Sequence, residues 1–471
     1  MVYEFQNIET PPSHPVGGCS AVTAAMARVA ERLGVENGSG ARLMRASVAQ
    51  AFEPGSVAGA REGQAGWAAT PLRKRLRFVR SFRHLLARRA ASLARAAAEV
   101  SGRPVAEKLV SEILPLADAC RWLERNAART LATRYFGRRG RPLWLQGASF
   151  EVQRQPFGIV LVIGPGNYPL FLPAVQAMHA LVAGNAVFLK PAPGAWDVAW
   201  AFAKLARFAG LEPALLTVLP ETVEAARRAI THGVDKVVFT GSSENGRDVL
   251  SELATSNTPA VMELSGQDAV LVLADADVSL VVRALSFGTR WNGGVTCMAP
   301  RRVIAAEPLA SDLRAQMCRA GILALPVEEV ASEEAALRRL AASRFGLGVS
   351  IFSRDIARAR SLAGRISCGF VLVNDLIVPT ADPRMPFGGV RESGFGVTRG
   401  EEGLLEMTFP HVVVVRQGRS RPHFDELRAD DERLFASYIQ AAHGRGPKRV
   451  EAIRDLIRAL LARTKIKETS Q

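Results

Sequence analysis

The feature that most constrains the fold is an alternation of short apolar runs with helical patterns, which begins at Phe157. The runs are four to seven residues long, as strands commonly are. Strands that alternate with helices in this way predict a parallel sheet with helices on both faces. We expect strands at 157–163, 186–189, 215–219 and 236–239, and helices at 169–182, 196–209 and 221–231.

Regions with other patterns flank this alternation. Apolar residues recur with a period of 3.6 over 71–136, which predicts two or three long amphipathic helices. A second α/β series runs from 260 to 395. We expect a weakly patterned segment at 1–66 with one helix at 20–33, and a first α/β domain at 67–259 with a hairpin arm at 142–154 that turns near Gly147. A second α/β domain follows at 260–400, then an arm strand at 401–420 and a helical basic tail at 421–471.

Charge and cysteine content argue against several classes of protein. The net charge of +15 comes largely from arginines, but those in 71–100 recur on helical spacings, as on a solvated helix face. Basic and aromatic residues do not interleave as in a base-stacking platform, so we expect no nucleic-acid partner. The five cysteines lie far apart without zinc-ligand spacing, which predicts no metal site and favours a reducing cytoplasm. We expect no signal peptide and no membrane-spanning helix.

One cysteine stands in a context that favours chemistry. Cys297 follows Gly293 and Gly294 and precedes the pair Arg301 and Arg302. Glycines let a backbone pass close to a ligand, and a thiol near cationic charge and backbone N–H donors can reach the thiolate form that a nucleophile needs. The alternative is a small buried apolar residue. Polar residues upstream favour the nucleophile.

Two of these upstream residues follow predicted strands, where open α/β sheets bind ligands. The turn that starts at Ile163 and contains Pro165 ends in Asn167 and Tyr168, and the Asn167 amide could donate to a developing oxyanion. The alternative is a turn residue or a helix N-cap. Lys190 ends a strand and could bind ribose hydroxyls or a phosphate, or it could be an ordinary lysine at a sheet edge.

Two more motifs lie at later strand ends. Gly241 and Ser242 turn a strand into a helix that contains Gly246, and unsatisfied N–H groups at such a helix start suit a pyrophosphate. The alternative is an ordinary serine N-cap. Glu263 and Leu264 lie in an apolar run, where burial would raise the pKa of the Glu263 carboxyl towards that of a general base. The alternative is an exposed strand residue.

Together these motifs resemble the aldehyde dehydrogenase superfamily, in particular its class 3, fatty-aldehyde-like branch. The resemblance covers roughly residues 70–415. It implies an α/β fold with two Rossmann-like parallel-sheet domains and a small β oligomerisation arm, and a homodimer. Residues 67–259 are then the dinucleotide-binding domain, and residues 260–400 are the catalytic domain. The matching segments are GPGNYP at 164–169, LKPAP at 189–193, FTGSSENGR at 239–247, MELSG at 262–266, NGGVTCMAPRR at 292–302 and PFGGVRESGFG at 386–396.

The resemblance also implies residue roles. Cys297 is then the nucleophile, Asn167 and the Cys297 backbone N–H form the oxyanion hole, and Glu263 is the base for deacylation. Lys190 holds the adenosine ribose of NAD or NADP. The other implied positions are Gly241, Ser242, Gly246, Ile163, Pro165 and Leu264 around the cofactor, with Tyr168 and Phe387 beside the substrate.

The chain departs from the family pattern in three places. Pro193 stands where the family has a carboxylate that grips the adenosine ribose, and Ser265 and Gln267 replace residues of the family's Glu-Leu-Gly-Gly-Lys motif. The segment after Cys297 is several tens of residues shorter than in the family. We expect a strand at Ile322–Val327 and a shortened catalytic domain without the family's Glu-Ile-Phe-Gly-Pro motif, whose glutamate binds the nicotinamide ribose.

The combined reading is NAD(P)-dependent oxidation of a small-molecule, hydrophobic aldehyde, aliphatic or aromatic, to a carboxylic acid through a thiohemiacetal and a thioester on Cys297. Two alternatives remain at this point. One is an acylating, coenzyme-A-dependent enzyme of the same fold, against which Glu263 argues. The other is a catalytically impaired homologue that acts as a binding or assembly subunit.

The last predicted helix carries a separate expectation. Val450, Ile453, Ile457, Leu460 and Leu461 fall on one face of Lys448–Lys465, and basic residues supply the rest. Such a helix can lie in an anionic membrane interface, which would make the protein cytoplasmic with peripheral membrane contact. Alternatively, it docks its apolar face on the domain or on a second subunit.

Overall fold

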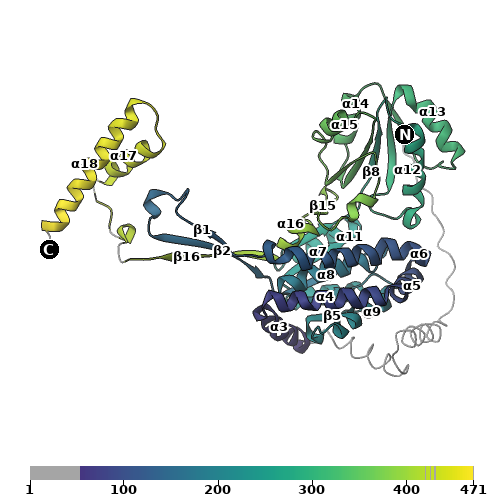
Figure 1. Ribbon diagram of the computed structural model, residues 1–471, viewed down its shortest axis with the longest axis horizontal. Helices are drawn as coiled ribbons and strands as arrows, with labels where there is room; N and C mark the ends of the chain where they lie inside the picture. Colours follow the sequence, from purple (N-terminus) through teal and green to yellow (C-terminus); the bar gives the residue numbers. More distant parts are fainter. Residues whose placement is uncertain (1–53, 419–420, 425, 429–430, 470–471) are drawn as a thin grey trace. The chain divides into compact units, whose positions relative to one another are not determined.

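The computed structural model describes residues 54–418, 421–424, 426–428 and 431–469, so the helix expected at 20–33 lies outside the described residues. The described chain forms two units (Figure 1). The first comprises residues 54–135 and 151–413, and the second comprises 136–150 and 414–469.

The first unit contains a six-stranded sheet with the strand order β15-β7-β6-β3-β4-β5. Its strands are parallel except for the short edge strand β15, which is antiparallel to β7. The strands are β3 (Ile159–Ile163), β4 (Ala186–Lys190), β5 (Leu216–Val218), β6 (Lys236–Thr240), β7 (Ala260–Glu263) and β15 (Gly394–Phe395), and the intervening helices are α8 (Phe171–Ala183), α9 (Trp196–Phe208), α10 (Val223–Thr231) and α11 (Ser243–Leu253). The predicted alternation is confirmed, with shifts of one or two residues at the ends.

Helices that precede the sheet in sequence pack around it (Figure 1). They are α3 (Pro54–Ala69), α4 (Leu72–Arg88), α5 (Ala90–Ser101), α6 (Val105–Lys108), the π-helical turn Leu109–Ile113 and α7 (Leu114–Thr130). The described end of the weakly patterned segment 1–66 is helical, because α3 begins at Pro54. The Gly- and Ala-rich α3 has little apolar periodicity, yet it docks through Trp67, whose Nε1 donates to the Leu181 carbonyl at 2.7 Å.

The first unit also contains a five-stranded parallel sheet with the order β10-β9-β8-β12-β13. Val270 and Val272 of β8 face one apolar cluster, and Ala269 and Leu271 face another, so both faces of this sheet are buried. The strands are β8 (Asp268–Val272), β9 (Pro300–Ala306), β10 (Val327–Val330), β12 (Gly348–Phe352) and β13 (Phe370–Val373), and the helices are α12 (Val278–Arg290), α13 (Glu307–Arg319), α14 (Glu333–Ala341) and α15 (Ile356–Ala363).

The connection between α13 and β10 corrects a predicted strand. Residues 320–326 form a turn and a short link, and β10 begins only at Val327. Gly321 turns the chain with a φ of 74°, and Ile322 fills the apolar cluster beside α12 and α13. Ile322 and Leu325 of the apolar run thus pack on a core cluster, and residues 322–325 do not pair in the sheet. Seven residues separate α13 from β10.

Short elements complete the first unit and lead into the second. They are the 3-10 turns Pro213–Leu215, Trp291–Gly294 and Val378–Ala381, β11 (Phe345–Gly346) paired with β14 (Val390–Arg391), and α16 (Gly400–Leu405). A three-stranded sheet has the order β1-β2-β16, formed by β1 (Arg134–Phe136), β2 (Ala148–Pro156) and β16 (Thr408–Arg416). The hairpin predicted within 142–154 is wrong: Leu143–Leu145 is a 3-10 turn, and β2 lies between strands outside that range.

The second unit ends in the two helices that the sequence predicts for the tail, α17 (Asp431–His443) and α18 (Pro447–Thr469), preceded by the 3-10 turn Pro422–Phe424. The two helices pack on each other through Leu434, Ala441 and Ala452, and Arg449 donates from Nε to the Ala441 carbonyl at 2.9 Å. No helix among the described residues is long and apolar enough to span a bilayer.

Candidate active site

The carboxyl ends of the parallel strands β3, β4, β6 and β7 open into a cavity of about 800 Å³ within the first unit. This is where open α/β sheets hold ligands, and the volume suits a small organic molecule or a cofactor. The cavity brings together every predicted site residue except Gly246, namely Ile163, Pro165, Asn167, Tyr168, Lys190, Gly241, Ser242, Glu263, Leu264, Cys297 and Phe387.

Cys297 lies on the segment that joins α12 to β9. Asn292, Gly293 and Gly294 adopt φ values of 49°, 66° and 72°, so the chain coils tightly before it extends into β9. The Cys297 side chain is partly exposed to the cavity. Burial, together with the charges of Asp268 and Glu263, raises the pKa of its thiol to about 12, although Arg399 and a backbone N–H lower it. Arg399 thus supplies the nearby cationic charge, and formation of the thiolate stays a prediction.

Asn167 lies opposite this segment. Its Nδ2 donates to the Val295 carbonyl at 2.8 Å, and its Oδ1 accepts from the Tyr168 N–H at 2.9 Å. The side chain is therefore fixed beside the Cys297 segment and does not act as a helix N-cap. One of the two Nδ2 hydrogens is used by Val295, which leaves the other for an oxygen in the cavity. Tyr168 shares a hydrogen bond of 2.8 Å with Thr296.

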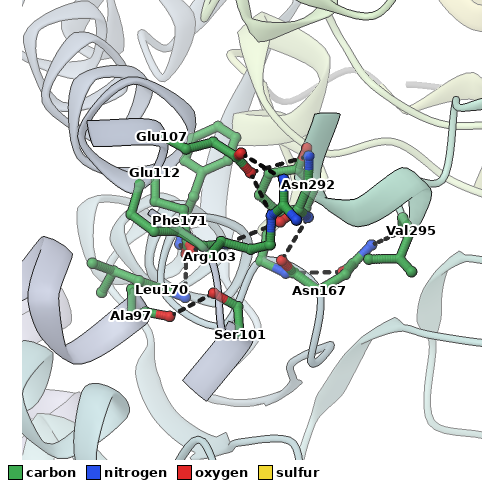
Figure 2. A network of polar contacts seen from close by, with 12 residues as sticks. Ala97, Ser101, Arg103, Glu107, Glu112, Asn167, Leu170, Phe171, Asn292 and Val295 are labelled. Atoms are coloured by element: carbon green, nitrogen blue, oxygen red, sulfur yellow. Dashed lines mark hydrogen bonds and ion pairs between the residues drawn. The ribbon is translucent and has the colours of Figure 1, made fainter. Parts of the chain in front are cut away.

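A buried polar scaffold behind the cavity joins the Asn167 turn to the Cys297 segment, and Figure 2 shows part of it. Lys108 and Glu112, both fully buried, form an ion pair of 3.0 Å across the π-helical turn. Glu112 accepts the N–H groups of Leu170 and Phe171 at 2.7 and 3.0 Å, which fixes the start of α8. Lys108 donates to Asn292 Oδ1 at 3.1 Å.

Asn292 connects the scaffold to the turn that contains Asn167. Its Nδ2 donates to the Asn167 carbonyl at 2.8 Å, and its backbone N–H donates to Glu107 Oε1 at 3.0 Å. Glu107 in turn pairs with Arg103 at 3.0 Å (Figure 2). The sequence did not indicate this scaffold. The scaffold depends on the π-helical turn Leu109–Ile113, which contains one residue more than an α-helical turn, and such turns have no periodicity of their own in sequence.

Glu263 ends β7 and is 4% exposed, which excludes the exposed-strand alternative. Burial raises the pKa of its carboxyl, although three neutral donors bind it. Thr240 donates to Glu263 Oε2 at 3.0 Å, Gln176 donates to the same oxygen at 3.2 Å, and Thr398 donates to Oε1. A carboxylate held by neutral donors at a raised pKa suits a general base. These three donors were missed from the sequence, where they have no motif.

The other end of the cavity fits an adenine dinucleotide. Ser242 caps α11 by accepting the Asn245 N–H, and both residues line the cavity, so this helix start can receive a pyrophosphate. A Cβ on Gly241 would lie 2.6 Å from the Phe239 ring, and a Cβ on Gly246 would lie 2.6 Å from Leu264. The two glycines therefore allow the backbone to pack closely against Phe239 and Leu264, which both line the cavity, although Gly246 itself does not.

Lys190 completes the cofactor end. It ends β4, which lies between β3 and β5, so it is not the edge-strand lysine of the alternative reading. Burial lowers the pKa of Lys190, and the charge of Glu221 opposes that effect. Glu221 also accepts the Gly194 N–H at 2.9 Å, next to Pro193. Sequence reasoning missed this carboxylate because it follows β5 instead of the Lys190 motif.

Comparison with known proteins agrees with this geometry. The model of the aldehyde dehydrogenase family matches residues 41–320 and 324–413. A 4,4'-diapolycopene aldehyde oxidase from Methylomonas sp. is 26% identical over 73% of this chain and 78% of that protein, and a geranial dehydrogenase from Castellaniella defragrans is 27% identical over 74% and 87%. The solved structure of Gox0499 covers 78% of this chain and 95% of its own, with 25% identity and a TM-score of 0.71.

The dinucleotide crevice, the thiol and the buried carboxylate are thus found in a chain that matches the family model over most of its length. The chain belongs to the aldehyde dehydrogenase family and is an oxidoreductase that oxidises an aldehyde with NAD or NADP.

Proposed function

We propose that Cys297, Asn167 and Glu263 carry the two half-reactions of aldehyde oxidation. The Cys297 thiol loses its proton to water, the thiolate sulfur bonds to the carbonyl carbon, and Glu263 stays a carboxylate for the second half-reaction. The free Nδ2 hydrogen of Asn167 and the Cys297 N–H stabilise the oxyanion. The observation that carries the proposal is that one cavity holds all three groups.

The second half-reaction releases the acid. Loss of hydride from the thiohemiacetal leaves a thioester on Cys297, and Glu263 takes a proton from the water that attacks it. The carboxylic acid leaves and the thiol re-forms. When bound, the nicotinamide cofactor supplies the hydride acceptor. Lys190, Gly241 and Ser242 are the residues that would hold its adenosine and pyrophosphate parts.

We further propose an apolar substrate. Much of the cavity wall beside Cys297 is apolar, including Phe171, Leu172, Trp291, Ile377 and Phe387. Val110 and Leu114 are about half exposed at its rim. Two relatives are named for geranial and for 4,4'-diapolycopene aldehyde, which are both apolar aldehydes. An apolar wall of this kind discriminates against charged aldehydes by leaving their charge desolvated.

A substrate panel tests both parts of this proposal. Formation of NAD(P)H is measured with aliphatic, isoprenoid and aromatic aldehydes and with a carboxylated semialdehyde, each with and without coenzyme A. The proposal requires turnover with apolar aldehydes, a kcat/KM at least tenfold lower for the semialdehyde, and no dependence on coenzyme A. Turnover that requires coenzyme A would instead assign an acylating enzyme, and no turnover with any aldehyde would leave the binding-subunit alternative.

We also propose that the chain lies in the class 3, fatty-aldehyde-like branch, with a shortened catalytic domain. The six motifs quoted from its sequence support the branch. The direct link of seven residues between α13 and β10, which contains no acidic residue, supports the shortening. The nicotinamide ribose would then lack a carboxylate partner from this link. A KM for NAD that is unchanged when residues 320–326 are replaced by a Gly/Ser linker would agree with this.

Assembly and location are further proposals. We propose a cytoplasmic homodimer that uses β16, whose residues Val412, Val414 and Val415 are more than half exposed. Sedimentation velocity tests it, because charged substitutions at these valines should yield monomers. We propose peripheral membrane contact through α18, since Val450, Ile453, Ile457, Leu460 and Leu461 are 40 to 61% exposed. Binding to anionic but not neutral vesicles, lost on truncation after Gly446, would support it.

A further inference from the structure

Arg399 is a buried cation in the cavity that the reaction scheme above does not use. It is 3% exposed, lines the cavity with Cys297 and Glu263, and precedes α16 directly. Its backbone has a φ of 61°, a conformation that is strained for a residue with a side chain. Such strain persists where the surrounding structure requires a particular placement.

The guanidinium is held by a backbone carbonyl and two aromatic rings. Nη1 donates to the Thr380 carbonyl at 2.6 Å, and the group lies 4.5 Å from the centre of the Phe387 ring and 5.7 Å from that of Phe171. Within the described part of the chain, no carboxylate lies within ion-pair distance of Arg399, and its buried Nε has no hydrogen-bond partner. A buried cation is normally paired, so this arrangement leaves positive charge available.

The groups around Arg399 show what that charge acts on. Glu263 at the end of β7 and Cys297 before β9 interact with it electrostatically, as does Asp382 after the 3-10 turn Val378–Ala381. Burial and, to a smaller extent, the charge of Arg399 lower the pKa of His179 on α8. Of these four groups, Glu263 and Cys297 line the cavity. The Cys297 thiol additionally faces Asp268.

The proposed reaction places two negative charges in this apolar cavity, because it needs Cys297 as a thiolate and Glu263 as a carboxylate. Each charge makes the other less favourable. Asn167, Thr240, Thr398 and Gln176 supply neutral donors only. A fixed cation between aromatic rings stabilises such charges without having to reorganise when they appear.

We propose that Arg399 is a positioning residue whose charge allows the Cys297 thiolate and the Glu263 carboxylate to form in the same apolar cavity. The proposal rests on the function assigned to Cys297 and Glu263 and names the cation that serves them. Arg399 acts through these groups, which carry out the chemistry. The side chain that opposes their charges thus comes from the segment between β15 and α16, outside the recognised motifs.

The pH dependence of Cys297 alkylation tests this in the free enzyme. Full-length protein is treated with iodoacetamide between pH 6 and 11, and modification of the Cys297 peptide is followed by mass spectrometry. The variants are Arg399→Met, which removes the charge but fits the aromatic surroundings, Arg399→Gln, which keeps a donor for Thr380, and Arg399→Lys, which keeps the charge. Arg319→Gln removes an exposed arginine of the same unit as a matched control.

Removing an opposite charge close to an acid raises its pKa by roughly one unit or more, so Arg399→Met and Arg399→Gln should alkylate about tenfold more slowly below pH 9. Arg399→Lys should stay within about threefold of the wild type, and Arg319→Gln should match it. The pH profile of kcat/KM should shift to higher pH in the same two variants. If either uncharged variant folds and its alkylation profile equals that of the wild type, the proposal is overturned.

Failure of the underlying function gives a different result. If alkylation of Cys297 leaves turnover intact, Cys297 is not the nucleophile, whatever the Arg399 variants show. A purely structural role for Arg399 predicts lower thermal stability in all three variants, Lys included, with an unchanged alkylation profile in whichever variant folds. That result also contradicts the proposal.

Discussion

Replacing Glu112 by Gln tests the buried scaffold most sharply, because the change preserves shape and removes one charge. Lys108 and Glu112 are both fully buried, and their charged atoms lie 3.0 Å apart. The glutamine carbonyl can still accept the N–H groups of Leu170 and Phe171. The change therefore leaves Lys108 as an uncompensated buried cation, while most of the backbone contacts survive.

The expected cost follows from that isolation. Breaking a buried ion pair by removing one partner costs about 3–5 kcal/mol, of which desolvation of the remaining charge is the larger part. Glu112→Gln should lower the free energy of unfolding by about that amount, as measured by urea denaturation. Adding Lys108→Met to the same chain removes the stranded charge and should recover part of the loss, because a buried pair replaced by uncharged residues is often close to neutral.

Catalysis should fall together with stability. The scaffold fixes Asn292, which holds the Asn167 carbonyl at 2.8 Å. A misplacement of about 1 Å in a reacting geometry can cost about a hundredfold in rate, so kcat should drop by about ten- to a hundredfold with little change in KM. Glu124→Gln, which breaks a partly buried pair with Arg83 remote from this scaffold, is the control and should leave kcat within twofold. A Glu112→Gln enzyme with wild-type kcat and a stability loss below about 1 kcal/mol would refute the reasoning.

Three further predictions follow from the site. Cys297→Ala should abolish turnover, whereas Cys368→Ala should not; steady-state assays with one apolar aldehyde decide this. Burial lowers the pKa of His179 from 6.5 to about 4, so the folded state binds fewer protons than the unfolded state between these pH values. The free energy of unfolding, measured by urea denaturation, should therefore be unaffected by His179 above pH 6.5 and should fall by about 3 kcal/mol as the pH falls towards 4. His179→Gln should remove that part of the pH dependence, and an unchanged slope would exclude His179 as its source. The kcat/KM for NADP should lie within about tenfold of that for NAD, because Pro193 imposes no charge repulsion on a 2′-phosphate. A thousandfold preference for NAD that Glu221→Gln abolishes would show that Glu221 binds the adenosine ribose and repels the 2′-phosphate.

The fold was largely predictable because its signal is local. Strands β3 to β6 and their helices follow from apolar runs and helical periods within about 80 residues, and the tail helices follow in the same way. The α3 helix escaped prediction because Gly and Ala give it almost no periodicity. The strand predicted at 322–327 failed because an apolar run that fills a core looks the same in sequence as one that pairs in a sheet.

For the site too, residues with a local sequence motif were predictable, and residues whose role depends on tertiary burial were not. Asn167, Glu263 and Cys297 lie in turns and strand ends with their own local motifs, so the sequence indicated them. Arg399 is far from those motifs in sequence, and its role depends on burial against two aromatic rings. Charge state was also beyond sequence reasoning: the Cys297 segment suggests an activated thiol, whereas burial and two nearby carboxyl groups give the thiol a pKa of about 12.

The central claim is that an acyl group passes through Cys297 and needs Glu263 to leave. The most direct measurement is the mass of the Cys297 peptide from Glu263→Gln enzyme quenched after mixing with an apolar aldehyde and NAD or NADP. The account predicts one equivalent of NAD(P)H per site, followed by arrest with Cys297 carrying the acyl mass. An unmodified Cys297 peptide from enzyme that turns over at the wild-type rate, or an acyl mass on another residue, would contradict it.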